Sequence, residues 1–261
     1  MTEREAFIAG IAAEPDDDTA RLAFADWLQE HGDGERAAFV RLQCAVARRR
    51  PEPEEQDWRI IPAPDADDDV LAAALLARWP GWFGPVLVAL GMPAPGPAAR
   101  PKQPGDPWRY GPYVLHHPRL APREVPLTLA SDYDDERGGW RPPTQFVNTL
   151  RLDRGFVTGL TLSLAFRPSE CSLADALRLE PVDALELQLD ADPELWESLS
   201  DPILNRVRAL DLSLAHYHDP RPDFADAAER LLNDPHLCGV RRLTFWGERN
   251  EYDEPGGALP A

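Results

Sequence analysis

Histidine and carboxylate side chains that lie close together in the sequence are candidate metal ligands, because metal ions in proteins are often bound by imidazole nitrogens and carboxylate oxygens. His216, His218 and Asp219 stand close together in the chain, and His116 and His117 offer two more imidazoles. Alternate residues of a strand face the same way, so His216 and His218 converge only if a strand runs through them. The segment directly follows a predicted strand, and we expect it to be a loop. The pattern therefore favours no metal site.

Aspartate runs at 16–18 and 67–69 suggest calcium at first sight. Neither has the alternating aspartate spacing with a distal glutamate that a calcium loop requires. Both runs instead precede apolar residues at helical spacing, where carboxylates favour the positive end of a helix. The sequence predicts two helix N-termini there.

Nucleophilic and phosphate-binding motifs are missing from the sequence. It contains no Gly-x-Ser-x-Gly, HExxH, glycine-rich phosphate loop or Rossmann fingerprint. Lys102, the one lysine, stands in a proline-rich stretch. Cys44, Cys171 and Cys238 are an odd number of cysteines at long spacings, which indicates neither a disulfide framework nor a zinc site of the CxxC kind, and we expect reduced, mostly buried thiols. These observations predict a protein that is not an enzyme and that uses no cofactor and no metal.

The formal charge of −18 comes from 45 acidic and 27 basic side chains. This charge disfavours direct binding to nucleic acid or to an anionic membrane surface, and it favours a neutral or basic protein partner. No run of 18 apolar residues is present, and the charged N-terminus leads straight into an amphipathic pattern. We expect a cytoplasmic protein without a membrane span; its oligomeric state stays open.

The first fifty residues predict a compact cap of three short helices. Thr2 and Glu5 have capping-box spacing at the start of a helix over 2–13. A second helix follows Asp16–Asp18 and stops near Gly32, and a third covers 35–49. Residues 51–148 then form a helix plus a proline-rich irregular connector. The helix is predicted from Asp69 to Trp79, ending at Pro80 and Gly81, and 91–143 is expected to hold short strands at most.

Leucine repeats give the last third, 149–261, its regularity. Leu160–Leu164, Leu185–Leu189 and Leu210–Leu214 alternate apolar and polar residues with first leucines 25 residues apart, and a fourth strand begins 33 residues later at Leu243. Helical segments at 173–179, 193–199 and 224–232 separate them. Strand–helix units of this period are typical of leucine-rich repeats. The sequence therefore predicts an α/β fold that ends in a short solenoid of about four parallel strands.

One stretch resembles a known family. Asp18-Thr-Ala-Arg-Leu-Ala-Phe-Ala-Asp-Trp-Leu-Gln-Glu-His-Gly-Asp33, with Ala38-Phe-Val-Arg-Leu-Gln43, is similar to the bacterial repeat-companion domain of planctomycetes and myxobacteria. That module stands beside repeat proteins, and the resemblance implies a bacterial cap for leucine-rich repeats without enzymatic activity. Arg154-Gly-Phe-Val157 looks like an element that leads from cap to repeats. The repeats are degenerate, because 215–218 lacks the asparagine that usually follows the strand leucines.

The polar residues between the strand leucines are the candidate partner-binding site, since they project from the concave face of such a sheet. Trp246 is the strongest candidate anchor, because tryptophan is enriched at interface hot spots. Asp26 and Trp27 are interpreted as structural, with Trp27 between helices and Asp26 paired to Arg21 or Arg41. The candidate residues of the face are Thr161, Ser163, Glu186, Gln188, Asp211, Ser213, Thr244 and Trp246.

These features favour a non-catalytic scaffold that binds a protein through the repeat face, the helical cap, or both. A second hypothesis is a small hydrolase or metalloenzyme whose site lies in the irregular middle region. A third is an acidic mimic of nucleic acid, which requires the acidic residues to cluster on one face.

Overall fold

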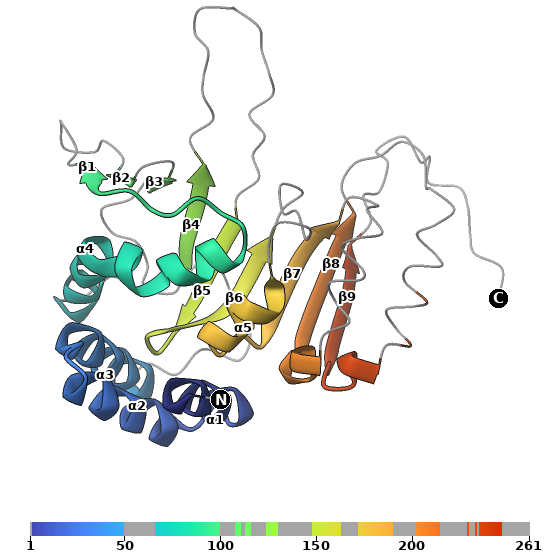
Figure 1. The fold of residues 1–261 in the computed structure, drawn as a ribbon, viewed down its shortest axis with the longest axis horizontal. Helices are drawn as coiled ribbons and strands as arrows, with labels where there is room; N and C mark the ends of the chain where they lie inside the picture. Colours follow the sequence, from blue (N-terminus) through green and yellow to red (C-terminus); the bar gives the residue numbers. More distant parts are fainter. Residues whose placement is uncertain are drawn as a thin grey trace, which may run out of the picture.

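The computed structural model has an α/β fold in which helices pack against a mixed sheet (Figure 1). It describes residues 2–49, 66–99, 108–110, 113–115, 124–129, 148–162, 172–189, 202–214, 229, 233 and 235–246. Several predicted features lie outside these residues: both histidine pairs, Cys171, Ser163, the segment 193–199 and nearly all of 224–232.

Three helices form the N-terminal cap as predicted: α1 (Glu3–Ala13), α2 (Asp18–Glu30) and α3 (Gly34–Arg49). The capping box is present, because the Thr2 hydroxyl accepts the Glu5 amide at 3.2 Å and Glu5 accepts the Thr2 amide at 2.6 Å. Asp17 caps α2 by accepting the Thr19 amide at 2.9 Å. Gly32, with φ +89°, follows the end of α2. Local capping chemistry therefore sets these helix boundaries.

The fourth helix, α4 (Ala66–Ala89), corrects the prediction that a helix ends at Pro80 and Gly81. Each internal proline removes one backbone donor and disfavours the helix by about 3 kcal/mol. The prolines are nevertheless accommodated, because the residues around them lie on a face that is buried against α3 and the sheet. That face carries Trp79, Trp82, Phe83, Val86 and Leu87, none more than 7% exposed. Tertiary burial thus outweighs local propensity.

Nine described strands lie in the sheet in chain order, each beside the next. Pairs from β1 to β6 are antiparallel, and pairs from β6 to β9 are parallel. Between Gly91 and Pro143 the described strands are short, as expected. The strands are β1 (Ala98–Ala99), β2 (Trp108–Tyr110), β3 (Tyr113–Leu115), β4 (Glu124–Leu129), β5 (Asn148–Asp153), β6 (Phe156–Leu162), β7 (Ala184–Leu189), β8 (Ala209–Leu214) and β9 (Arg242–Trp246).

The four parallel strands that the leucine spacing predicted are present. Leu160 pairs with Leu185, Leu185 with Leu210, and Leu210 with Leu243. A backbone ladder repeats just before the strands: the Asp183 amide donates to Thr158 O at 2.9 Å, and the Arg208 amide to Asp183 O at 2.7 Å. The Arg241 amide then donates to Arg208 O at 2.8 Å. A short helical element precedes each of the last three strands: α5 (Leu173–Leu179), η2 (Pro202–Arg206) and η3 (Pro235–Leu237).

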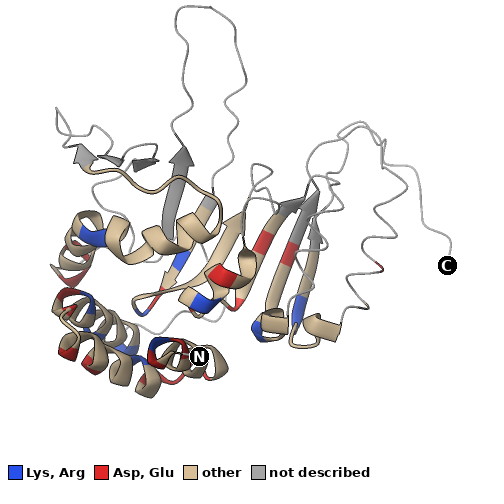
Figure 2. Ribbon diagram, in the orientation of Figure 1, with Lys and Arg blue, Asp and Glu red and all other residues tan. Residues whose placement is uncertain are grey.

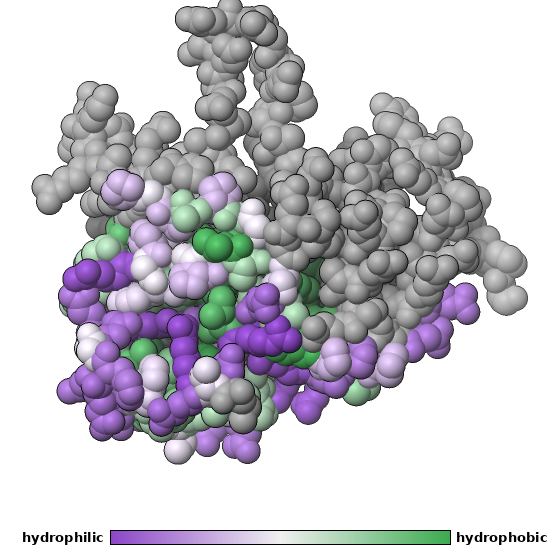
Figure 3. Space-filling view, viewed as in Figure 1, coloured by the Kyte–Doolittle hydropathy of each residue, from purple (hydrophilic) through white to green (hydrophobic). Residues whose placement is uncertain are grey.

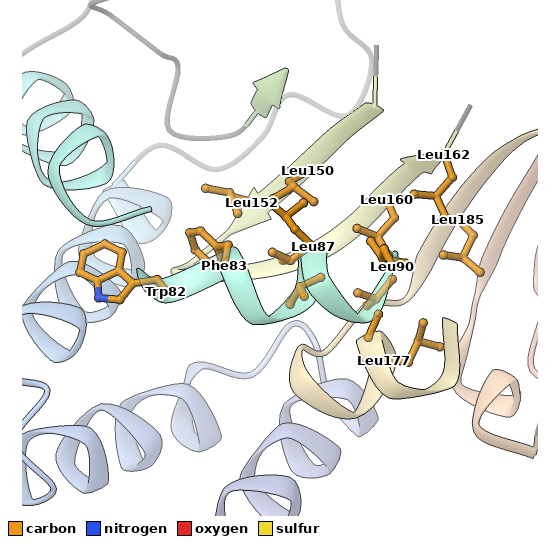
Figure 4. Packing of buried hydrophobic residues seen from close by; sticks show 14 of the residues in the cluster. Trp82, Phe83, Leu87, Leu90, Leu150, Leu152, Leu160, Leu162, Leu177 and Leu185 are labelled. Atoms are coloured by element: carbon orange, nitrogen blue, oxygen red, sulfur yellow. The ribbon is translucent and has the colours of Figure 1, made fainter. Parts of the chain in front are cut away.

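The leucine side of the strands builds the main core. Figure 4 shows Leu87 of α4 and Leu90, which directly follows this helix, over β5 and β6, with Leu177 of α5 and Leu185 of β7 continuing the same layer. The Ser172 amide donates to Ala89 O at 2.9 Å and so joins the start of α5 to the end of α4. The helical elements therefore cover one face of the strands, and the alternate strand residues point to the other face.

The exposed side of α4 has little polarity, and Figure 3 shows paler surface over it than over α1–α3. Val70 and Val88 are 56% and 55% exposed. By length and composition alone, α4 is apolar enough to cross a membrane, but 56% of that window is buried inside the protein. A buried core helix passes the same test, so this is weak evidence for a membrane span.

Candidate partner-binding face

The predicted binding residues that the structure describes fall into two rows across the parallel strands. In the first row Thr161 pairs with Glu186, Glu186 with Asp211, and Asp211 with Thr244. In the second row Gln188 pairs with Ser213 and Ser213 with Trp246. The strand register therefore brings together every predicted face residue except Ser163, which lies outside the described residues.

Two carboxylates stand side by side in the first row. Glu186 Oε2 accepts the Thr161 hydroxyl at 3.1 Å, and Asp211 Oδ2 lies 3.6 Å from Arg242 Nη2. The Arg242 side chain is 62% exposed, so water screens this ion pair strongly. Like charges on paired strand positions disfavour the pairing. A cation from outside would relieve this repulsion, which makes the row a favourable place for a guanidinium or ammonium group.

Small residues form a further row on the same face, two positions earlier in each strand. Gly159 pairs with Ala184, Ala184 with Ala209, and Ala209 with Arg242. On the other side of Gly159 lies its antiparallel partner Arg151. The Arg151 side chain lies over this glycine, since a Cβ there would stand 3.1 Å from Arg151 Cβ and 3.2 Å from Nε. Arginines therefore flank the small row at both ends.

Sequence reasoning missed Arg151 and Arg242 as members of this face. The signal for Arg242 was its place two residues before Thr244, on the same side of β9. Arg151 stands between Leu150 and Leu152, an alternation typical of a strand, but β5 was not predicted. Its antiparallel hairpin with β6 departs from an all-parallel repeat region.

The interpretation of Asp26 and Trp27 as structural is confirmed. Arg41 Nη2 donates to Asp26 Oδ1 at 2.7 Å, whereas Arg21 pairs elsewhere. Trp27 stacks on Phe24 with ring centroids 5.4 Å apart, and its Nε1 donates to Glu3 of α1 at 3.0 Å. Trp27 therefore joins α1 to α2.

The described cysteines differ from one another. Burial is the main cause that raises the pKa of the Cys44 thiol to about 12, with the charge of Asp18 adding to it. Cys238 is an exception to the prediction of mostly buried thiols, because it is exposed in the turn between η3 and β9. Its Sγ donates to Asn205 Oδ1 at 3.6 Å. Within the described residues no group of three histidine, cysteine or acidic side chains is placed to hold a metal ion.

Acidic and basic side chains intermingle on the cap helices, as Figure 2 shows for α1–α3. Arg48 Nε lies 2.9 Å from Asp18 Oδ2, and Arg78 of α4 pairs with Glu35 of α3. A nucleic-acid mimic needs unneutralised acids gathered on one face. The mixed charges on the described helices give that hypothesis no support.

No known protein family, no curated protein and no solved structure matches this chain.

Proposed function

We propose that this chain is a non-catalytic interaction module, in which a helical cap of the repeat-companion type precedes a short, degenerate leucine-rich-repeat solenoid. Support comes from the leucine register of β6–β9 and from the backbone ladder Thr158, Asp183, Arg208 and Arg241. The intervals of 25, 25 and 33 residues in that ladder are those of the leucine repeats.

The partner is a protein segment that carries arginine, and it binds to the polar strand face. The observation that carries this proposal is the in-register alignment of Glu186 and Asp211 on the face opposite α4 and α5. The small side chains of Ala184 and Ala209 in the neighbouring row let an extended segment approach the sheet, beside Gly159, which the Arg151 side chain covers. Arg242 beside Asp211 illustrates how a guanidinium is received there.

An array of extended arginine peptides, each matched by a copy with neutral citrulline, tests the proposal on the full chain. Wild-type protein should retain arginine peptides and release their citrulline copies. Glu186→Gln with Asp211→Asn should weaken binding about thirtyfold or more, because loss of one member of an interfacial charge pair costs ~2–5 kcal/mol. Charge reversal at both positions should weaken it further.

Asp26→Asn is the matched control, since it removes one carboxylate from the cap and leaves the strand face intact. Trp246→Ala tests the predicted anchor. Equal binding of arginine and citrulline peptides, or wild-type affinity in the strand variants, would contradict the proposal.

A further inference from the structure

One buried carboxylate joins three elements that are far apart in the chain. Glu180, directly after α5, is 0% exposed. Its Oε1 accepts Arg36 Nη2 of α3 at 2.6 Å, and its Oε2 accepts the Val157 amide of β6 at 3.0 Å. Arg4 of α1 adds a longer ion pair to Oε1 at 3.7 Å. Two cap helices and the first parallel strand therefore meet at Glu180.

The arginine of this pair is buried as deeply as the acid. Arg36 is 3% exposed, and its guanidinium carbon lies 5.4 Å from the ring centroid of Phe83 and 5.8 Å from that of Phe156. These rings belong to α4 and β6, so Arg36 reaches from the cap into the boundary between the two hydrophobic clusters. The ring faces attract the guanidinium, but without Glu180 it would be a buried charge that has lost its counter-charge, which is unfavourable.

Two kinds of contact surround this pair. The apolar one is buried, since Phe156 of β6 packs on Phe24 of α2 with ring centroids 5.6 Å apart, and Gln43 of α3 accepts the Gly155 amide beside it. The remaining polar contacts between cap and sheet are longer or more exposed. Arg208 Nη2 donates to Ala13 O at 2.6 Å, and Arg154 Nη1 donates to Pro15 O at 3.0 Å. Arg21 Nη2 lies 3.5 Å from an Asp153 oxygen whose side chain is 43% exposed. If one of these exposed contacts breaks, water can take the place of the lost hydrogen-bond partner. The Arg36–Glu180 pair is buried, so water does not reach it.

We infer that Glu180 and Arg36 form a latch that holds the helical cap docked on the sheet. Breaking the pair releases α1–α3 before β7–β9 open. The cap is then a module that can undock, and the charged pair, whose members are 144 residues apart, adds to the apolar packing of Phe156 on the cap. This inference is independent of the proposed partner-binding face.

Hydrogen–deuterium exchange of the full chain, followed by peptide mass spectrometry, tests the latch. In Glu180→Gln the exchange of α1–α3 amides should rise about a hundredfold or more, because an unpaired buried charge is strongly destabilising. Exchange in β7–β9 should stay at the wild-type rate. Asp26→Asn is the control, because it also removes one negative charge from an ion pair with an α3 arginine, but that pair, Asp26 with Arg41, is exposed. It should leave exchange in α1–α3 and in β7–β9 unchanged.

The double variant Arg36→Met/Glu180→Gln keeps the test decisive if the single variant does not fold. It leaves no buried charge without a partner, because Arg4, which also loses its ion pair, has a side chain that is 34% exposed. The glutamine can still accept the Val157 amide. Cap exchange should therefore be slower in the double variant than in Glu180→Gln. Wild-type cap exchange in Glu180→Gln, an equal rise throughout the sheet, or no recovery in the double variant would overturn the inference.

Discussion

Gly155→Ala tests how tightly the turn between β5 and β6 packs on the cap. Arg154 and Gly155 have φ of 49° and 90°, as a two-residue hairpin turn of the primed kind requires. A Cβ on Gly155 would lie 2.5 Å from Val40 Cγ2 and 2.9 Å from Val40 Cα. Because one of these atoms is backbone of α3, rotation of the valine side chain cannot relieve the overlap. The turn and the cap must move apart.

The expected loss of stability has two parts. The left-handed backbone costs alanine about 1–2 kcal/mol, and overpacking against α3 adds about 1–3 kcal/mol. Gly32→Ala isolates the first part, since Gly32 has φ +89° and no atom lies within 4 Å of the position that its new methyl group would take. Urea unfolding followed by tryptophan fluorescence and far-UV circular dichroism measures both variants. Equal losses of unfolding free energy would refute the close packing of the turn on Val40.

Three more perturbations address the core, a thiol and a helix cap. Leu185→Ala should lower the unfolding free energy by about 2–5 kcal/mol, whereas Val88→Ala, at an exposed site, should change it by less than about 0.5 kcal/mol in the same urea experiment. Iodoacetamide at about pH 8 should leave Cys44 unmodified in the folded protein and label exposed Cys238, as peptide mass spectrometry would show. The pKa of Asp17 is lowered mainly because its carboxylate accepts a hydrogen bond from the Thr19 backbone amide. The stabilising contribution of its charge is therefore present above the unfolded-state pKa and lost as the pH falls through the folded-state pKa. The deficit of Asp17→Ala in thermal unfolding should be clear at neutral pH and smaller at strongly acidic pH.

Local signals predicted the cap helices and the parallel strands. Thr2 and Glu5 act within four residues of each other, and the leucine alternation of β7 and β8 depends only on the two-residue period of a strand. The length of α4 could not be predicted in this way, because Pro80 and Pro85 are unfavourable locally. Packing on α3 and on a sheet formed by residues much later in the chain stabilises the helix across the prolines.

The candidate face was predicted in composition but not in its surroundings. Spacing alone aligned Glu186 with Asp211, and the register agrees. The Arg36–Glu180 pair had no local signal, since a single glutamate before a proline is typical of an exposed loop. Its burial depends on three elements that converge in space.

The most direct test of the binding proposal is site-specific photocrosslinking of the full chain to the tightest arginine peptide. The photoreactive amino acid p-benzoylphenylalanine would replace Thr244 on the strand face in one protein and exposed Ala38 of α3 in another. We predict crosslinks to the peptide from position 244 and none above background from position 38. Crosslinks from position 38 alone would contradict the proposal and assign binding to the helical cap.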